Sequence, residues 1–322
     1  NLIAYSIILA LWGAGLQLFY RFYCYKRFAE THLSFCREKK VYTEMLSYSL
    51  WDTVGAFCAT GNYQGINILM NVFFGVTVNA ARQVSYQVET GINQLASNLV
   101  TSINPQIVKN YAKGDYKRFF QLIYEGGRYA YYLMFFIAFP VCLEANYILH
   151  LWLVEVPEYS VLFLRFVLCI SLFRMFSRSI LSGVHATGNV KTLNLTSGVY
   201  SAGTFLPAVY IAYKLDAPVW SCFVIQSFNL CICTMFEVRA LYKQIHFNIA
   251  DYFIKVYAYS IGVSLVSIIP SVLLVWLLEP SFLRLILTLV ISTISLSFCI
   301  YTIGINKDTR SKINKFVFNK IR

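Results

Sequence analysis

Charged side chains are scarce in this sequence, and their scarcity limits what kind of protein it encodes. Only 13% of the 322 residues are Asp, Glu, Lys or Arg, whereas 58% are hydrophobic. A soluble globular protein carries about 25% charged residues, so this chain has too little charge to cover a soluble surface of its size. Its mean hydropathy is +0.58. We therefore expect an all-α fold, a polytopic bundle of transmembrane helices.

Acidic residues are rarer than basic ones, with 15 Asp and Glu against 27 Lys and Arg, which gives a net charge of +12. The basic residues lie in loops between apolar runs, not on one face among aromatic residues, so we expect no nucleic-acid partner. Twenty of them fall in alternate loops and in the tail, at 21–43, 105–118, 183–191, 239–255 and 306–322. The opposite loops hold only Lys214 and Arg284. This positive-inside pattern predicts that the basic loops and the C-terminus are cytoplasmic.

Enzyme motifs are absent from the sequence: there is no HExxH, GxSxG, P-loop or EF-hand pattern. The four histidines are isolated, and the nine cysteines lie mostly in apolar segments, where we interpret them as small buried hydrophobic residues. We thus expect no catalytic residues, no metal site and no cofactor. An ATP-hydrolysing module is not predicted, so any energy that the protein uses must come from an ion gradient or from a substrate.

Apolar windows of about 20 residues recur about nine times, and each can cross the hydrocarbon core as a helix. The predicted spans are 2–20, 46–73, 79–103, 119–140, 158–182, 190–213, 217–238, 253–278 and 282–304. Pro105 is predicted to end the third helix, and Gly114-Asp115 to form a turn before the fourth.

The second and third spans carry polar residues that lipid-facing helices avoid. Six of them share one stripe of the third helix: Arg82, Ser85, Glu89, Asn93, Ser97 and Asn104. From first to last the rise is about 33 Å, the thickness of the hydrocarbon core. Five more share one face of the second helix: Thr53, Thr60, Gln64, Asn67 and Asn71. Interhelical hydrogen bonds explain single amides, but two continuous stripes favour a water-filled, substrate-facing surface.

The predicted substrate-cavity residues come from these stripes and from one deep arginine. They are Gln64, Asn67, Asn71, Arg82, Glu89, Asn93 and Arg165. Arg165 is included because it lies about two turns inside its helix and is expected to point inward. For Arg82, which lies nearer the outer interface, snorkelling is an equal alternative.

Glu89 is the first candidate for energy coupling, and Asp52 is the second. Glu89 lies near mid-depth, where a charged side chain costs ~3 kcal/mol on insertion scales. Three roles stay open for it: pairing with a base such as Arg165, binding a coupling ion, or taking up a proton.

Other charged residues have local roles in this interpretation. Arg174 and Arg178 lie near the cytoplasmic end of their helix, so we expect them to snorkel to lipid headgroups. Glu125 and Arg128 are one turn apart, and we expect them to form a local ion pair.

The run NYQGINILMNVFFGVTVNAARQVSYQV, followed by INQLASNLVTSINPQIVKNYAKGD, resembles the polysaccharide-export branch of the MOP superfamily, which also contains the MATE drug exporters. The segments YILHLWLVEVPEYSVLFLRFVL and GVHATGNVKTLNL resemble the same branch. The resemblance implies a MATE-like fold, with two six-helix lobes around a central cavity. It assigns residues 1–20 to the last helix of the first lobe and 21–43 to a cytoplasmic inter-lobe loop. It also makes 44–243 the second lobe, 244–305 two accessory helices and 306–322 a basic cytoplasmic tail, so we expect this sequence to be a C-terminal fragment.

By the same resemblance, the protein is a flippase in the bacterial inner membrane. Its substrate is an undecaprenyl-diphosphate-linked glycan, an O-antigen, capsule or exopolysaccharide repeat unit, moved outward by alternating access with proton or sodium coupling. Arg165 and Arg82 are then candidates for the anionic glycolipid, and the amides for sugar hydroxyls. Two alternatives stay open: a cation-coupled multidrug exporter of the same superfamily and, less favoured, a membrane-embedded polysaccharide polymerase, which generally needs a larger non-membrane loop.

Overall fold

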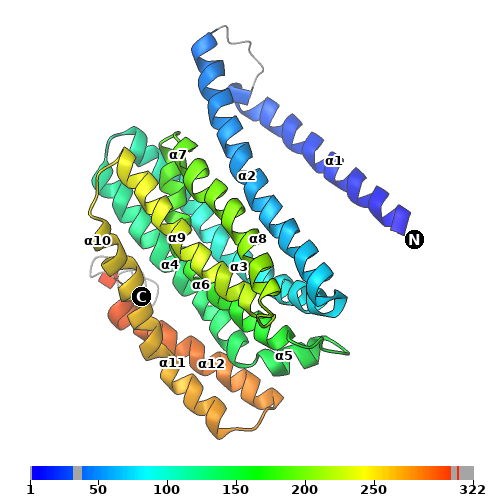
Figure 1. Ribbon diagram of the computed structural model, residues 1–322. Helices are drawn as coiled ribbons and strands as arrows, with labels where there is room; N and C mark the ends of the chain where they lie inside the picture. Colours follow the sequence, from blue (N-terminus) through cyan, green and yellow to red (C-terminus); the bar gives the residue numbers. More distant parts are fainter. Residues whose placement is uncertain (1, 32–37, 306–309, 312–322) are drawn as a thin grey trace. The chain divides into compact units, whose positions relative to one another are not determined.

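The structure is a computed structural model, and it describes residues 2–31, 38–305 and 310–311. Apart from Arg310 and Ser311, the predicted tail 306–322 lies outside the described residues, and so does the part of the inter-lobe loop at 32–37. The described chain is almost entirely helical and contains no strand (Figure 1). The all-α expectation is confirmed.

Twelve α-helices follow one another along the described chain. They are α1 (Leu2–Arg27), α2 (Lys39–Phe74), α3 (Val76–Ala112), α4 (Tyr116–Leu143), α5 (Ala145–Trp152), α6 (Ser160–Ala186), α7 (Lys191–Leu193), α8 (Val199–Lys214), α9 (Ser221–Gln244), α10 (Ile249–Tyr252), α11 (Tyr259–Leu277) and α12 (Phe282–Cys299). Short π-helical stretches join or extend some of them: η2 (Asn194–Gly198), η3 (Phe253–Ala258) and η4 (Ile300–Gly304). A 3₁₀ turn, η1, covers Ala29–Thr31.

Six helical segments in the described part are long and apolar enough to cross a membrane. They are Ile3–Arg27, Tyr116–Leu143, Ser160–Ala186, Ser221–Gln244, Ile249–Leu277 and Phe282–Gly304. The number of such helices indicates a multi-pass membrane protein. The three other predicted spans fall on α2, on α3 and on the segment 191–214, and α2 and α3 carry the polar stripes.

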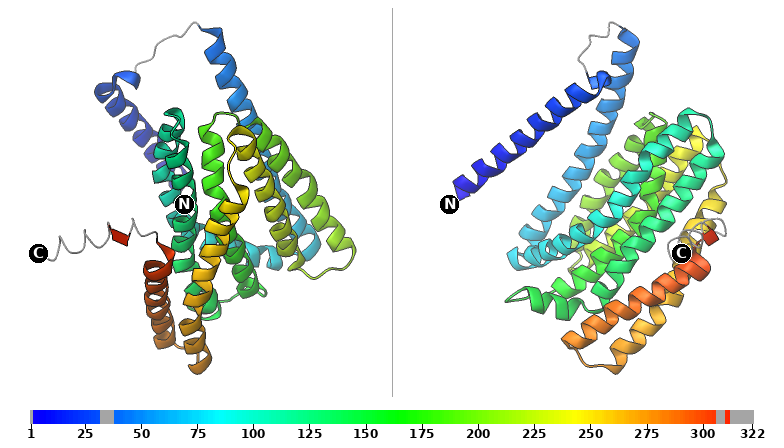
Figure 2. Two further views of the ribbon diagram at one scale, coloured as in Figure 1. Left: turned by 90° about the vertical axis from the view of Figure 1, so that its left-hand side faces the viewer. Right: turned by 180° about the vertical axis from the view of Figure 1, so that it is seen from behind.

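The chain divides into two compact units, Asn1–Ser47 and Tyr48–Arg322. The first holds α1, η1 and the beginning of α2, and the second holds all later helices. At the centre of the second unit, α3, α4 and α6 pack on one another (Figure 2). Their buried residues include Phe119 and Phe176, and the Phe176 ring stacks on Tyr131 with centroids 4.4 Å apart.

A second, smaller apolar core joins α2 to its neighbours in this unit. It contains Ile66 and Met70 of α2 together with Phe205 of α8 and Phe223 of α9. Helix α2 comes very close to η2 at Gly55. A Cβ added to Gly55 would overlap with the side chain of Asn194. Small residues at such crossings let two helix backbones approach, which is how membrane helices gain packing energy.

The structure confirms only one of the two predictions about where α3 ends and the next turn begins. Gly114 has φ 75° and ends the helix region, and the side chain of Asp115 accepts a hydrogen bond from the Arg118 backbone N at 3.0 Å, so the predicted turn is confirmed. The expectation that Pro105 ends the helix is wrong, because α3 continues to Ala112 with Pro105 inside it. A proline inside a membrane helix is tolerated where neighbouring helices compensate for the lost hydrogen bond.

Helices α11 and α12 form an antiparallel pair that also packs on α4 (Figure 1). A buried ion pair fixes this contact: Arg284 Nη2 of α12 lies 2.7 Å from Glu144 Oε2, at the end of α4. Thr288 Oγ1 donates to the other carboxylate oxygen at 3.2 Å, and Arg284 Nη1 donates to the Leu278 carbonyl at 2.9 Å. Arg284, an exception to the positive-inside pattern, thus has a counter-charge within the fold.

Candidate functional site

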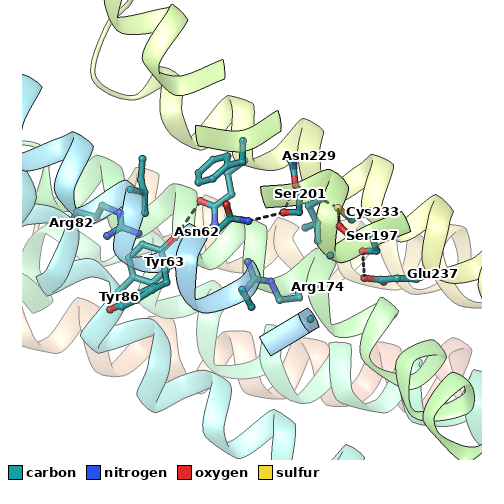
Figure 3. A pocket seen from close by; sticks show the side chains of 17 residues that line it. Asn62, Tyr63, Arg82, Tyr86, Arg174, Ser197, Ser201, Asn229, Cys233 and Glu237 are labelled. Atoms are coloured by element: carbon teal, nitrogen blue, oxygen red, sulfur yellow. Dashed lines mark hydrogen bonds between the residues drawn. The ribbon is translucent and has the colours of Figure 1, made fainter. Parts of the chain in front are cut away.

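The second unit encloses a cavity of about 350 Å³ between α2, α3, α6, η2, α8 and α9 (Figure 3). Its lining is mixed, with amides, hydroxyls, two arginines, two tyrosines and a carboxylate among apolar side chains. The lining residues are Gly55, Ala59, Asn62, Tyr63, Ile66, Arg82, Tyr86, Arg174, Ser197, Gly198, Ser201, Phe205, Gln226, Asn229, Leu230, Cys233 and Glu237. Except for α6, which contributes Arg174 alone, each helix supplies lining residues three or four apart, as expected when one helical face lines the space.

A chain of hydrogen bonds crosses the cavity wall from α2 to α9. Asn62 Nδ2 donates to Ser201 Oγ at 3.0 Å, and Ser201 Oγ donates to Asn229 Oδ1 at 2.9 Å. Asn229 Nδ2 in turn donates to Thr204 Oγ1 at 2.9 Å. The Oδ1 atom of Asn62 is buried without a partner. Because an unpaired buried acceptor is costly, this oxygen is ready to accept a hydrogen bond from a ligand or from water.

Arg82 lies at one end of the cavity between two tyrosine rings (Figure 3). Its guanidinium carbon is 4.5 Å from the Tyr86 ring centroid and 5.6 Å from that of Tyr63. Its Nη1 donates to Asn67 Oδ1, which also accepts from Gln83 Nε2 at 2.6 Å. Arg82 is only 3% exposed, so it does not snorkel to the surface of the bundle.

Glu237 lies toward the other end of the cavity, near Ser197 and Cys233 (Figure 3). Ser197 Oγ donates to Glu237 Oε1 at 3.4 Å, whereas Oε2 is buried without a hydrogen-bond partner. Arg174 also lines the cavity, yet within the described residues no ion pair joins it to Glu237. The cavity therefore offers two guanidinium groups that form no ion pair within the described residues, and the Glu237 carboxylate lines the same space.

This arrangement suits a ligand that is both polar and anionic. Guanidinium groups bind phosphate or carboxylate oxygens through charge-assisted hydrogen bonds. The amide and hydroxyl chain can exchange hydrogen bonds with hydroxyl groups, and the tyrosine faces give an apolar surface against which a ring can pack. A deep apolar pocket for a hydrophobic drug would not need this set of groups.

The structure distributes the predicted site residues over three environments. Of the seven predicted substrate-cavity residues, only Arg82 lines the cavity. Asn67 of α2 contacts the Arg82 side chain. Three other residues predicted from α2 are exposed, namely Asp52, Gln64 and Asn71. Arg165 is also exposed, and its Nε donates to the Cys142 carbonyl at 3.2 Å instead of pairing with Glu89. The expected inward orientation of Arg165 toward this cavity is therefore not observed.

Glu89 and Asn93 lie in the contact between α3 and α6, away from the lining. Glu89 is 5% exposed, and its Oε1 accepts from Ser171 Oγ of α6 and from Asn93 Nδ2 at 3.0 Å. Nearby on the same stripe, Ser85 Oγ donates to the Ser160 carbonyl at 3.1 Å. Three of the six residues of the α3 stripe, Arg82, Ser85 and Glu89, therefore form interhelical hydrogen bonds, which was the alternative to a water-filled surface.

Sequence reasoning missed the polar residues of η2, α8 and α9. Ser197 and Ser201 are four residues apart, and so are Asn229, Cys233 and Glu237, so each set lies on one helical face. That spacing within apolar segments was a usable signal. Arg174 was expected to snorkel, but it lines the cavity and is half-buried. The local ion pair expected between Glu125 and Arg128 does not form, because Glu125 accepts from Gln121 Nε2 at 2.9 Å.

No three His, Cys, Asp or Glu side chains gather to hold a metal ion within the described ranges 2–31, 38–305 and 310–311. Comparisons of the chain with family models, with curated proteins and with solved structures find no match. The class rests on the architecture itself: an all-α, multi-pass membrane protein with a polar cavity inside its helix bundle.

Proposed function

We propose that this protein is a transporter that moves a lipid-linked oligosaccharide across the membrane by alternating access. The observation that carries the proposal is the cavity, where Arg82 and Arg174 face the same space as a chain of amides and hydroxyls. Burying a cation in a membrane protein is costly, and such residues usually mark a path for a substrate or an ion. Arg82 is buried and Arg174 is half-buried, and neither forms an ion pair among the described residues, which favours an anionic substrate.

The side chains that line the cavity can bind the different parts of such a substrate. The diphosphate of an undecaprenyl-linked glycan would bind Arg82 and Arg174, and sugar hydroxyls would bind Asn62, Ser201 and Asn229. Ligand sites generally have volumes of about 300–1,000 Å³. At about 350 Å³, this cavity holds only part of an oligosaccharide, which we assign to the diphosphate and the first sugar.

In this proposal, the three polar helical segments also cross the membrane. Helices α2 and α3 and the segment 191–214 would add to the six apolar spans and give nine crossings in a MATE-like arrangement. Their polarity is explained if they face the cavity and neighbouring helices instead of lipid. The basic loops would then lie in the cytoplasm and the bundle in the bacterial inner membrane. The resemblance of most of residues 44–240 to polysaccharide exporters supports the same arrangement.

Energy coupling is assigned to Glu89, with Asp52 as the second candidate. Glu89 is buried and bonded only to neutral donors, and in the described part no cation lies within ion-pair distance of it. It can therefore gain or lose a proton without breaking an ion pair. A sodium ion bound at the same carboxylate is the alternative form of coupling.

Inactivating the gene in the source cell tests the proposal. We expect lipid-linked repeat units to accumulate on the cytoplasmic side and surface glycan to be lost. Reintroducing the wild-type gene should restore the glycan, whereas Arg174→Gln should not. Unchanged surface glycan together with reduced dye efflux would instead support a cation-coupled multidrug exporter.

A further inference from the structure

A second cavity, of about 540 Å³, lies between α4 and the helical segment formed by α10, η3 and α11. It shares no residue with the first cavity. Its lining residues are Lys117, Phe120, Gln121, Tyr124, Glu125, Arg128, Lys255 and Tyr259. Both helical segments start next to basic loops, at 105–118 and 239–255, so this cavity opens at the end of the bundle that the charge pattern predicts to be cytoplasmic.

The lining of this basic cavity has an excess of positive charge. It contains three cations, Lys117, Arg128 and Lys255, against the single carboxylate of Glu125. Glu125 accepts a hydrogen bond from Gln121 and forms no ion pair with Arg128. Lys255 pairs with Asp251 at 2.6 Å, but that pair is exposed and weak. The excess charge therefore calls for an anion from outside the chain.

Arg128 is the residue that most needs such an anion. It is only 6% exposed, and its Nε has no hydrogen-bond partner. The ring of Tyr259 lies beside it, with its centroid 5.6 Å from the guanidinium carbon. Contact with one ring face compensates only part of the cost of burying a cation.

The other walls of the cavity suit a molecule that is partly apolar. Phe120, Tyr124 and Tyr259 contribute aromatic surface next to the cations. Aromatic rings with a polar tip are typical of the membrane interface, where headgroups and acyl chains meet. Basic pockets between membrane helices on the cytoplasmic side are known to bind anionic headgroups.

We propose that this cavity binds the phosphate of an anionic membrane phospholipid, with Arg128 as its deepest ligand and Lys117 and Lys255 at its entrance. The lipid's glycerol and upper acyl chains would pack on the aromatic walls. The chain's own tail is a poor occupant, because residues 306–322 carry six basic residues and only one acidic residue. The proposal does not depend on the transported substrate, because no residue of this cavity belongs to the transport cavity.

Lipid titration of the full chain purified in detergent tests the proposal. The Tm is followed while dioleoylphosphatidylglycerol, dioleoylphosphatidylcholine or inorganic phosphate is added. We expect phosphatidylglycerol to raise the Tm at lower concentration than the other two. Arg128→Gln should weaken the apparent affinity for phosphatidylglycerol about tenfold, since a charge-assisted hydrogen bond is lost.

Lys255→Gln provides a second test that is independent of the fold, because Lys255 is exposed. It should weaken the affinity about threefold, as expected for one peripheral charge near a lipid surface. Arg118→Gln is the matched control, because Arg118 is exposed beside Lys117 but does not line the cavity. Equal effects of the two lipids, equal affinity for inorganic phosphate, or unchanged lipid affinity in both Arg128→Gln and Lys255→Gln would overturn the proposal.

Discussion

Two buried carboxylates, Glu144 and Glu89, show how one residue type has different partners in two regions of this protein. Glu144 is 1% exposed and Glu89 is 5% exposed. Glu144 lies at the end of α4, where Arg284 provides a full counter-charge at 2.7 Å. Glu89 lies between α3 and α6, where Ser171 and Asn93 provide only neutral hydrogen-bond donors.

Both carboxylates are buried, so burial does not distinguish them. What distinguishes them is the partner: an ion-paired carboxylate must stay charged, whereas one that is bonded to neutral donors can change its protonation state. Removing the charge of Glu144 would leave Arg284 buried and unpaired, so this pair is suited to tie α12 to α4. Adding a proton to Glu89 would break no ion pair among the described residues, although Arg178 lies near enough to interact with its charge. We therefore assign a structural role to the first carboxylate and a coupling role to the second.

The strongest test of this comparison removes the cation from the structural pair. Arg284→Leu should lower the free energy of unfolding by about 3–5 kcal/mol, because Glu144 stays buried without its counter-charge. Thermal unfolding in detergent measures the loss. Lys214→Leu is the control, because Lys214 is an exposed basic residue with no ion pair in the described chain. Equal stability of the two variants would contradict the structural role.

A smaller effect is expected when Glu89 loses one of its donors. Ser171→Ala should lower the free energy of unfolding by about 1–2 kcal/mol, since it removes a hydrogen bond to a carboxylate in the α3–α6 contact. The same thermal measurement applies. A loss as large as that of Arg284→Leu would show that Glu89 depends on its partners as strongly as Glu144 does, and would remove the distinction between them.

Glu89→Gln should change stability by less than about 1 kcal/mol, because glutamine keeps an acceptor oxygen for both donors. Transport should nevertheless be lost, since glutamine cannot exchange a proton. Membrane insertion and transport of lipid-linked glycan are measured in parallel. Full transport by a normally inserted Glu89→Gln protein would exclude Glu89 from coupling.

The smallest effect is predicted for the exposed stripe of α2. Asn71→Ala should change the free energy of unfolding by no more than about 0.5 kcal/mol, because exposed positions without partners contribute little. Asn93→Ala, on the α3 stripe, should cost more, because Asn93 bonds to Glu89. If thermal unfolding ranks these two variants the other way, the assignment of Asn93 to the hydrogen-bond network of Glu89 is wrong.

The sequence predicted the helical architecture and the Gly114 turn, because length, hydropathy and glycine act locally. It also identified α3 as a helix with a polar face. It did not predict where that face points, since a stripe such as Glu89 to Ser97 has the same spacing whether it faces water or another helix. Only the packed structure shows that Ser171 of α6 meets Glu89.

Most of the cavity lining could not be predicted from the sequence, because its residues come from segments far apart in the chain. Asn62 and Ser201 are 139 residues apart, yet they form a hydrogen bond. Arg174 and Arg165 lie on the same helix, and depth alone favoured the wrong one for this cavity. Which arginine faces the cavity depends on the rotation of α6 against its neighbours, which is set by tertiary packing.

The most direct measurement of the central claim compares these two arginines of α6. The protein is reconstituted into vesicles, and the movement of an undecaprenyl-diphosphate-linked glycan between leaflets is followed for each variant. Arg174→Gln should reduce movement at least about tenfold, because an anionic group loses a charge-assisted partner in the cavity. Arg165→Gln should transport at the wild-type rate, since Arg165 lies outside the cavity. Wild-type transport by Arg174→Gln, or no movement of the glycan by the wild-type protein, would contradict the account.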